Sequence, residues 1–413
     1  MKKIFTILIS AAIIVSITLS AGAALLSPGL LVLSEADPMV MSGLVGEPVA
    51  FTAKDFSLHT GFDAYDKIRI TSLPDSEEGT LSVAGEAISE NDSISYKNID
   101  RLVFSPAEGV TESAFSFSIG EGYEAKCVVK LSEKSNYAPT ASSALTAIDT
   151  FSGMSVSGHM VASDPEGDEL TYEITEYPKK GELSYNKSTG SFSYKSASTG
   201  KDSFTFIVKD NFGNYSDKAT VDFSVSSNTT GISFKDMKEN GAYAAAIHMI
   251  DDGIMSASES DGNVYFEPAA TVSRLDFLVS AMNVLGAGNL PTVSGTGFAD
   301  DEDIPADAKS YVYSAYKLGI INGSENADGE RFFHPAAAIT RAEAAVILNN
   351  IVGYSATAEF DFEDSVAAWA SDSVFSMYEL GVLTTDDGCI NASAPLTRDE
   401  SALLLHGLNK LVS

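Results

Sequence analysis

The stretch AITRAEAAVIL, residues 338–348, has the pattern of a helix start. Thr340 followed three residues later by Glu343 is a capping box, in which the hydroxyl accepts a hydrogen bond from a first-turn N–H and the carboxylate accepts one from the cap residue. Related stretches occur twice more, as TVSRLDF at 271–277 and PLTRDES at 395–401. We therefore expect three helices that begin alike, at Arg274, Arg341 and Arg398.

Residues 232–413 divide into three repeats in one register, 232–290, 291–354 and 355–413. Each repeat opens with an aromatic residue, one further residue and an aspartate, and then runs through a helical pattern to a glycine and an aliphatic residue. The aspartates are Asp236, Asp300 and Asp364, and the glycines are Gly253, Gly319 and Gly381. Aspartate and glycine are 17, 19 and 17 residues apart, and glycine and arginine are 21, 22 and 17 residues apart. Such regular spacing indicates a true internal repeat.

Capping does not explain the repeated arginine. Only four arginines follow residue 230, and three of them occupy this position. A helix N-terminus already carries partial positive charge, so a cation there is unfavourable unless an anion binds beside it. Either the arginines bind an anionic ligand, or each pairs with an aspartate of a neighbouring repeat. We favour ligand binding and leave both roles open for individual copies.

Residues before about 230 follow a different pattern. Short alternating runs at 115–119, 191–194 and 204–208 are separated by turn residues, which is typical of antiparallel β sandwiches. The motifs Gly79-Thr-Leu81 and Gly181-Glu-Leu183 begin the same order of runs in two units, residues 24–135 and 136–226. A polar segment, 227–231, is expected to link the second unit to the repeats.

Composition and the N-terminus restrict the class of protein. Lys2 and Lys3 precede an uncharged run and a small-residue segment that ends at Ala23, as in a secretory signal peptide of residues 1–23, and we expect no membrane insertion after its cleavage. Cys127 and Cys389 are the only cysteines and lie far apart, which excludes a disulfide framework. The net charge of −31 excludes nucleic acid as a partner.

One acidic cluster has the chemistry of a cation site. Asp164, Glu166, Asp168 and Asp210 offer the oxygen ligands that Ca²⁺ prefers. The other interpretation, which we favour, is a turn between strands with its carboxylates in water. We expect no cofactor other than this possible Ca²⁺.

Catalytic motifs do not emerge from the sequence. The five histidines are scattered, with no HExxH spacing, no Gly-x-Ser-x-Gly elbow and no Gly-rich phosphate loop. Paired carboxylates cannot be singled out among the 57 acidic residues. We therefore expect no enzyme activity.

Residues 232–413 resemble a set of three S-layer homology domains, and the middle copy carries the signature Ile339-Thr340-Arg341-Ala342-Glu343 intact. Residues 137–226 resemble bacterial cadherin-like repeats, with Asp164-Pro-Glu-Gly-Asp168 as the most specific segment, and residues 38–133 are similar without that cluster. The resemblance implies two antiparallel cadherin-like or immunoglobulin-like β sandwiches, followed by an all-α pseudo-threefold bundle.

The resemblance also implies a ligand, an acidic and typically pyruvylated secondary cell wall polysaccharide bound by the motif arginines. An aromatic residue twelve positions before the helix glycine stacks on sugar in this family; Trp369 stands there in the third copy, but Gly241 and Asp307 stand there in the others. The residues expected to form the polymer site are Arg274, Arg341, Arg398, Asp236, Asp300, Asp364, Gly253, Gly319, Gly381 and Trp369.

These expectations describe a secreted, non-catalytic protein of a bacterial cell wall or S-layer. Its helical repeats would anchor it to the wall polymer, and its β units would serve adhesion or spacing. The first alternative is a structural S-layer lattice subunit whose partners are other S-layer or surface proteins. The second is a wall-anchored enzyme that acts on glycans.

Overall fold

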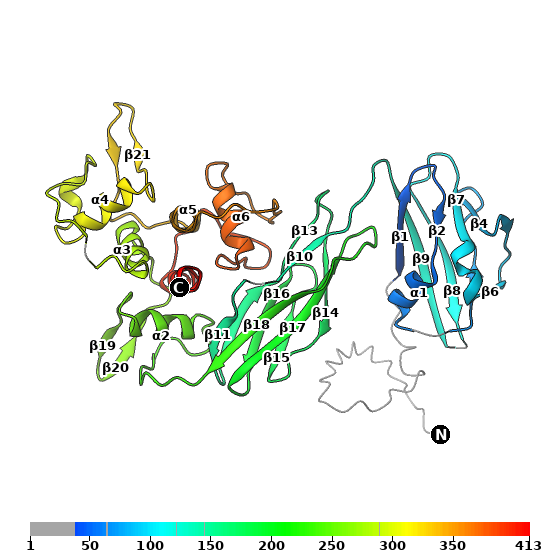
Figure 1. The fold of residues 1–413 in the computed structure, drawn as a ribbon, viewed down its shortest axis with the longest axis horizontal. Coiled ribbons are helices and arrows are strands. Elements are labelled where there is room, and N and C mark those ends of the chain that lie inside the picture. The colour runs from blue at the N-terminus through cyan, green and yellow to red at the C-terminus, as the bar shows by residue number, and fades with distance from the viewer. Residues whose placement is uncertain (1–37, 63–64, 121, 144, 289) are drawn as a thin grey trace, which may run out of the picture. The chain divides into compact units, whose positions relative to one another are not determined.

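The computed structural model describes residues 38–413 apart from 63–64, 121, 144 and 289 (Figure 1). The expected signal peptide, residues 1–23, and residues 24–37 lie outside the described residues. Within the described part of the chain, no helix combines the length and apolar character needed to cross a membrane. The chain divides into two compact units, one formed mainly by Val45–Val129 and the other mainly by Lys130–Ser413.

The first unit is β-rich, with one short helix. Its elements are β1 (Met39–Leu44), β2 (Val49–Ala50), α1 (Ala53–Thr60), β3 (Lys67–Ser72), β4 (Gly79–Val83), β5 (Glu86–Ala87), β6 (Ser93–Ser95), the 3-10 helix Tyr96–Arg101, β7 (Leu102–Pro106), β8 (Glu112–Ile119) and β9 (Tyr123–Ser132). They form sheets of order β1-β9-β8-β3-β6 and β2-β7-β4-β5. Buried phenylalanines form the core, and the rings of Phe56 and Phe117 meet edge to face at 4.8 Å.

The second unit begins with a sheet arrangement of the same order. Its strands are β10 (Thr140–Ser142), β11 (Ile148–Phe151), β12 (Ser155–His159), β13 (Val161–Ser163), β14 (Thr171–Glu176), β15 (Gly181–Tyr185), β16 (Ser191–Ser196), β17 (Gly200–Lys209) and β18 (Ala219–Ser226). The sheets β11-β18-β17-β14 and β12-β16-β15 enclose a core in which Tyr194 stacks on Phe223 at 3.8 Å. The pairing is antiparallel except between β11 and β18, which run parallel.

The repeated glycine of the two β regions lies beneath an aromatic ring. A Cβ atom at Gly79 would lie 2.5 Å from the carbonyl oxygen of Ser105, and one at Gly181 would lie 2.4 Å from the ring of Tyr194. Contacts this short do not occur for real side chains, so any larger residue would push the strands apart. The Gly-x-Leu motif therefore marks the same close approach of neighbouring strands, β4 to β7 and β15 to β16.

The C-terminal half is built from helices and two short hairpins. Its elements are α2 (Tyr243–Asp251), β19 (Ser258–Ser260), β20 (Asn263–Tyr265), α3 (Arg274–Val284), the 3-10 helix Asp301–Asp303, α4 (Lys309–Lys317), β21 (Ser324–Glu325), β22 (Arg331–Phe332), α5 (Arg341–Val352), α6 (Ser371–Glu379) and α7 (Arg398–Val412). The expectation of an all-α bundle is wrong at the hairpins, because the loop after the first helix of repeats 1 and 2 pairs with itself.

Helices pack across repeats rather than within them. The first helix of each repeat contacts the second helix of the preceding one: α4 packs on α3, and α6 packs on α5. The series closes on itself, because α2 of repeat 1 packs on α7 of repeat 3. A single repeat therefore cannot bury its apolar surface alone.

Three backbone hydrogen bonds join the repeats in a ring. The N–H of Val272 donates to the carbonyl of Leu396 (3.0 Å), that of Leu396 to Ile339 (2.8 Å), and that of Ile339 to Val272 (3.0 Å). Val272, Leu396 and Ile339 immediately precede the N-cap residues of α3, α7 and α5, respectively, and their side chains are buried. The three helix starts quoted from the sequence therefore meet at one approximate threefold centre.

The second β region and the helical half share one core. Phe151 of β11 and Val161 of β13 belong to the same buried cluster as the helices. His159 of β12 is 7% exposed and stacks on Tyr378 of α6, with ring centroids 4.0 Å apart and planes 12° apart. Among the described residues, neither ring nitrogen of His159 has a hydrogen-bond partner.

This burial predicts a pH dependence of stability. Burial lowers the pKa of His159 to about 3 from its ordinary 6.5. The unfolded chain therefore takes up a proton below pH 6.5 that the folded chain excludes, so the contribution to stability is complete above 6.5. As pH falls from 6.5 towards 3, we expect the free energy of unfolding to fall by on the order of 1 kcal/mol per pH unit. The measurement is urea unfolding between pH 4.5 and 7.5, with His159→Phe, which keeps the ring contact, as the control. Equal pH dependence in both proteins would contradict this role of His159.

Candidate functional site

The three repeated aspartates hold the loops of their own repeats. Asp236 accepts hydrogen bonds from the backbone N–H groups of Phe266 and Glu267, at 3.0 and 2.7 Å. Asp300 does the same for Phe333 and His334, and Asp364 for Ile390 and Asn391. Because both carboxylate oxygens already accept a backbone hydrogen bond, these side chains shape the groove walls.

The three repeated glycines end the first helix of each repeat. Gly253, Gly319 and Gly381 have φ of 71°, 74° and 72°, in the left-handed region. The residue after each glycine donates its N–H back into the last helical turn, as from Ile254 to the carbonyl of Met249 at 2.9 Å. This is a Schellman ending, which requires positive φ and so favours glycine.

The capping boxes predicted at Thr340 and Thr397 are both present. The other N–H groups of the first helical turns are not free to bind an anion, because a neighbouring repeat accepts their hydrogen bonds. Arg341 donates its backbone N–H to Ala394 and Ala342 donates to Ala392, at 3.0 and 2.9 Å. The first turns of α3 and α7 are satisfied in the same way. Anion recognition here would therefore depend on the guanidinium groups, and not on the helix N-termini.

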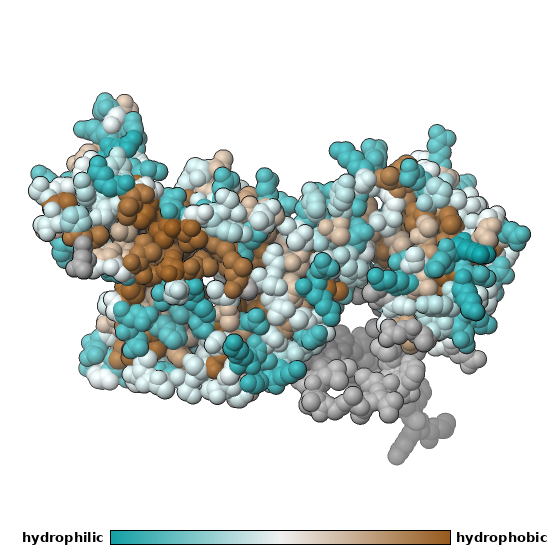
Figure 2. Space-filling model, in the orientation of Figure 1, coloured by the Kyte–Doolittle hydropathy of each residue, from teal (hydrophilic) through white to brown (hydrophobic). Residues whose placement is uncertain are grey.

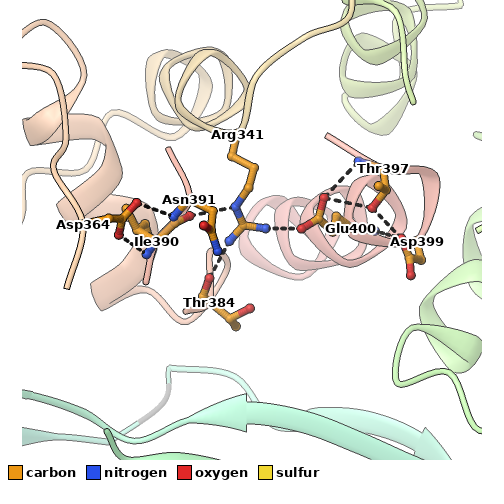
Figure 3. Close-up of polar contacts among 8 residues, drawn as sticks. All are labelled: Arg341, Asp364, Thr384, Ile390, Asn391, Thr397, Asp399 and Glu400. Carbon is orange, nitrogen blue, oxygen red and sulfur yellow. Dashed lines mark hydrogen bonds and ion pairs between the residues drawn. The ribbon is translucent and has the colours of Figure 1, made fainter. Parts of the chain in front are cut away.

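Each motif arginine reaches into the next repeat around the ring, but the three differ in what they find there. Arg341 is 7% exposed, and each of its three side-chain nitrogens has a partner (Figure 3). Its Nε donates to the carbonyl of Ile390 at 2.9 Å, its Nη2 to that of Thr384 at 2.5 Å, and its Nη1 pairs with Glu400 at 2.5 Å. Arg341 thus has the pairing role that was the alternative, but its partner is Glu400 and not the expected aspartate.

Arg398 contacts two backbone carbonyls and an aromatic ring of repeat 1. Its Nε and Nη2 donate to the carbonyls of Phe266 and Ser256, at 2.8 and 2.5 Å, and its guanidinium lies 4.8 Å from the ring centroid of Phe266. The position of Glu343 and Glu400 is held in repeat 1 by Asp276, which is one methylene shorter and accepts a hydrogen bond from Ser273 at 2.6 Å. The shorter acid stays at its own cap.

Arg274 is only partly satisfied. Its Nη1 pairs with Glu343 at 3.1 Å, and its guanidinium lies 5.6 Å from the ring centroid of Phe333. Its Nε is buried and has no hydrogen-bond partner in the part of the chain that the structure describes, whereas the Nε atoms of Arg341 and Arg398 each have one. Burial lowers the pKa of Arg274, and Glu343 opposes that effect.

One cavity of about 580 Å³ is lined by Ser157 of β12 together with Gly241 and Thr384 of the helical half. A second cavity contains Arg274, measures about 450 Å³ and is lined by residues of all three repeats. Arg274 contributes from repeat 1, Asn322 and His334 from repeat 2, and Trp369 from repeat 3. The indole of Trp369 is 64% exposed. A hydrogen-bond donor without a partner and an exposed aromatic surface therefore line the same groove.

The sequence did not single out Asn322, Ser324, His334 or Asn350 as lining residues of this groove. Asn322 and Ser324 follow the helix glycine Gly319, and the Oγ of Ser324 lies 2.8 Å from Nε2 of His334. The repeat alignment marks these loops as equivalent in position. It does not reveal which loops of different repeats face one groove.

The acidic cluster forms one compact group. One oxygen from each of Asp164, Glu166 and Asp168 can lie within 4.8 Å of the others, and no other such group of three metal-binding side chains occurs among the described residues. One oxygen of Asp164 accepts from the N–H groups of Glu166 and Asp168, while its other oxygen has no partner. Burial raises the pKa of Asp168, and the charges of Asp164, Asp210 and Glu166 raise it further.

Asp210 lies near this group but has a different role. Its carboxylate accepts from the N–H groups of Phe212 and Asn214, at 2.9 and 2.8 Å, and from the side-chain amides of Asn136 and Asn214, at 2.6 and 2.8 Å. Asp210 is 2% exposed. It therefore holds its own loop, and its negative charge acts on the cluster from a short distance.

Comparisons with known proteins identify two parts of the chain. Residues 136–227 match the bacterial cadherin-like domain, and residues 297–345 match the S-layer homology domain. The chain thus carries a cadherin-like domain in a β-rich N-terminal region with sandwich-like sheets, and an S-layer homology domain in its helical half. These domains indicate a cell-surface or cell-wall location.

Curated relatives match over shorter stretches. The chain is 28% identical over 151 residues to the Surface-layer 125 kDa protein of Lysinibacillus sphaericus, which covers 36% of this chain and 12% of that protein. It is 34% identical over 123 residues to Exoglucanase XynX of Acetivibrio thermocellus, which covers 29% and 11%. The matched stretches thus span little more than a tenth of each relative. Among solved structures, the fibronectin(III)-like modules of Clostridium thermocellum CbhA are 12% identical, with 47% of this chain and 93% of theirs covered and a TM-score of 0.22.

The geometry of Arg341 predicts a structural defect on its removal. Arg341→Met leaves Glu400 half-buried without its partner and leaves two carbonyls unpaired, so we expect a loss of about 3 kcal/mol in the free energy of unfolding. The measurement is urea unfolding followed by far-UV circular dichroism. Arg331→Met, at an exposed arginine of β22, is the control and should change stability little. Equal midpoints for the two variants would show that Arg341 does not join the repeats.

Proposed function

We propose that this chain is a secreted, non-catalytic surface protein that binds an acidic secondary cell wall polysaccharide through the groove of Arg274 and Trp369. All three repeats then act as S-layer homology domains, and the β domains serve adhesion or spacing outside the wall. The observation that carries the proposal is the buried, unpartnered Nε of Arg274 in a groove that also contains an exposed indole.

The chemistry of the groove favours an acidic sugar. A guanidinium binds a carboxylate through two parallel N–H···O hydrogen bonds, and Arg274 has its Nε unpaired. A pyruvate ketal presents such a carboxylate on a sugar ring, and an exposed indole offers a flat apolar face to the ring. The strong negative charge of the chain makes a selective cation of this kind necessary, because the surrounding field repels polyanions.

The three arginines are unequal in this proposal. Arg274 provides the main contact, and Arg398, which contacts two carbonyls and a ring, provides a second one. Arg341 holds repeats 2 and 3 together. The aspartates and glycines of the motif act indirectly by shaping the loops.

A lattice subunit is the second candidate. Figure 2 shows apolar side chains gathered on the helical half, over the region where Figure 1 places α3, α5 and α7. Val284, Val346 and Ile351 of these helices are only partly buried, and Leu285 and Val412 are 40% and 42% exposed. A surface of this kind can mediate contacts between copies. Sheets formed by the purified protein without wall polymer would favour this candidate, whereas monomers that bind wall fragments would favour anchoring.

We also propose that Asp164, Glu166 and Asp168 bind Ca²⁺ in the cadherin-like domain. Support comes from the oxygen of Asp164 that has no partner among the described residues, and from the pKa of Asp168, which burial raises first and the neighbouring carboxylates raise further. A divalent cation would relieve that repulsion and draw the turn at 164–168 together.

The polymer proposal predicts that Arg274→Ala weakens binding to purified pyruvylated wall polysaccharide by about 10- to 100-fold, through loss of a charge-assisted contact. Trp369→Ala, at an exposed side chain, should weaken it by about tenfold without affecting the fold. Removal of pyruvate from the polymer should abolish the difference between wild type and Arg274→Ala. The measurement is co-sedimentation of the full chain with wall fragments.

Arg331→Ala is the matched control, because it removes an equal charge from repeat 2 outside the groove. It should bind like wild type. Unchanged binding by both Arg274→Ala and Trp369→Ala, with helix content intact, would show that this groove is not the polymer site.

The calcium proposal predicts that roughly 10 mM Ca²⁺ raises the free energy of unfolding of the second unit by about 2 kcal/mol, given the affinities usual for extracellular modules. Asp164→Asn with Asp168→Asn should remove this gain. Glu169→Gln, an exposed neighbour outside the group, should keep it. A gain of equal size in the double variant, measured by thermal unfolding, would mean that calcium acts elsewhere.

A further inference from the structure

The groove of Arg341 differs from that of Arg274 at one decisive position. Gly241 stands twelve residues before Gly253, as Trp369 stands twelve residues before Gly381. Trp369 lines the Arg274 cavity, and Gly241 lines the Arg341 cavity, which measures about 410 Å³. The two positions are therefore equivalent around the ring, but one carries the largest side chain and the other carries none.

The cadherin-like domain lies where a side chain at 241 would point. A Cβ atom on Gly241 would lie 3.4 Å from the backbone nitrogen of Ser157 and 3.9 Å from its Cβ. Ser157 belongs to β12 and lines the same cavity as Arg341 and Glu400. An indole at this position would collide with the strand, so the glycine is what admits β12 to the edge of the groove.

Charged contacts hold the domain in this place. Asp149 of the cadherin-like domain pairs with His406 and Lys410 of α7, at 3.0 and 2.8 Å. Lys410 also donates to the carbonyl of Ala147. The side chains of all three paired residues are at most 24% exposed. Burial raises the pKa of Asp149, but the hydrogen bonds from His406 and Lys410 and the charges of both residues outweigh it and lower the pKa to about 2. Ion pairs shielded from water in this way are held more firmly than surface pairs.

Apolar contacts extend the same interface. Phe151 and Val161 complete the core of the helical half, and His159 covers Tyr378. The interface therefore combines a buried apolar patch, an ion-pair cluster and a close backbone approach. These are features of a fixed domain contact rather than of domains joined by a free linker.

We propose that the Arg341 groove is a docking site for β12 of the chain's own cadherin-like domain and is closed to wall polymer. This inference rests on the proposed function for its consequence: polymer binds at the Arg274 and Arg398 grooves, while the third groove fixes the orientation of the cadherin-like domain on the anchor. The guanidinium of Arg341 agrees with this division, because each of its three nitrogens already has a partner within the helical repeats.

A disulfide tests the docking directly. Ser157→Cys with Gly241→Cys, in a Cys389→Ser background, places two thiols whose Cβ atoms would lie 3.9 Å apart, within the usual disulfide range of about 3.5–4.5 Å. Cys127 is buried and can remain. We expect nearly complete cross-linking of the full chain under mild oxidation, read as a mobility shift that reductant reverses.

The matched control pairs Ser157→Cys with Asp307→Cys, the equivalent position of repeat 2, and should cross-link at least tenfold more slowly. Equal rates for the two pairs would overturn the docking. This arm involves no polymer, so its result holds whether or not the chain binds wall polysaccharide.

The locked protein then tests closure of the groove. Affinity for wall polymer should agree within about twofold between the oxidised and the reduced double variant, since the lock closes a groove that takes no polymer. A loss of tenfold or more on locking would show that the domain must swing away for binding, and would overturn the closure. Failure of both forms to bind would count against the proposed polymer function, while the cross-linking rates would still decide the docking.

Discussion

The helical half depends on a ring of three backbone hydrogen bonds, in which Val272, Leu396 and Ile339 each donate to the preceding repeat around the ring. These bonds use main-chain atoms only, so they place no demand on side chains except that they be apolar and buried. They fix the point at which α3, α5 and α7 begin, and the residue after each cap then necessarily faces the neighbouring repeat. The long reach of the motif arginines follows from this placement.

Because the ring is made by the backbone, the three grooves around it are free to differ. Arg341 has a partner for each of its three side-chain nitrogens, and Arg274 has a partner for a single nitrogen. Arg398 contacts two carbonyls and a ring. Arg398 differs from the other two because the acid at the equivalent position of its neighbouring repeat is Asp276, which is one methylene shorter than glutamate and stays at its own helix cap. Symmetry in the main chain thus coexists with three different side-chain environments.

Much of this architecture could be predicted from the sequence, because its signals are local. The capping boxes, the glycine helix ends and the alternating β runs depend on neighbours a few residues away, and they lie where they were expected. The contents of the grooves could not be predicted, because they join residues of different repeats. Trp369 belongs to repeat 3, but it lines the cavity of Arg274, which belongs to repeat 1. The helix N-termini seemed free because their acceptors, such as Ala394, lie more than fifty residues away.

The ion pairs between Asp149 and residues His406 and Lys410 of α7 affect how the chain would bear a mechanical load. Tension applied to the β domains of an anchored chain would enter the helical half in two ways, along the segment 227–231 and across the ion pairs to Lys410 and His406. The second route loads several contacts in parallel, in shear, and delivers force to the last helix of the ring, which itself packs on α2. A pull from outside would therefore be shared by the first and the third repeat at once, rather than peeling the ring open from its N-terminal end.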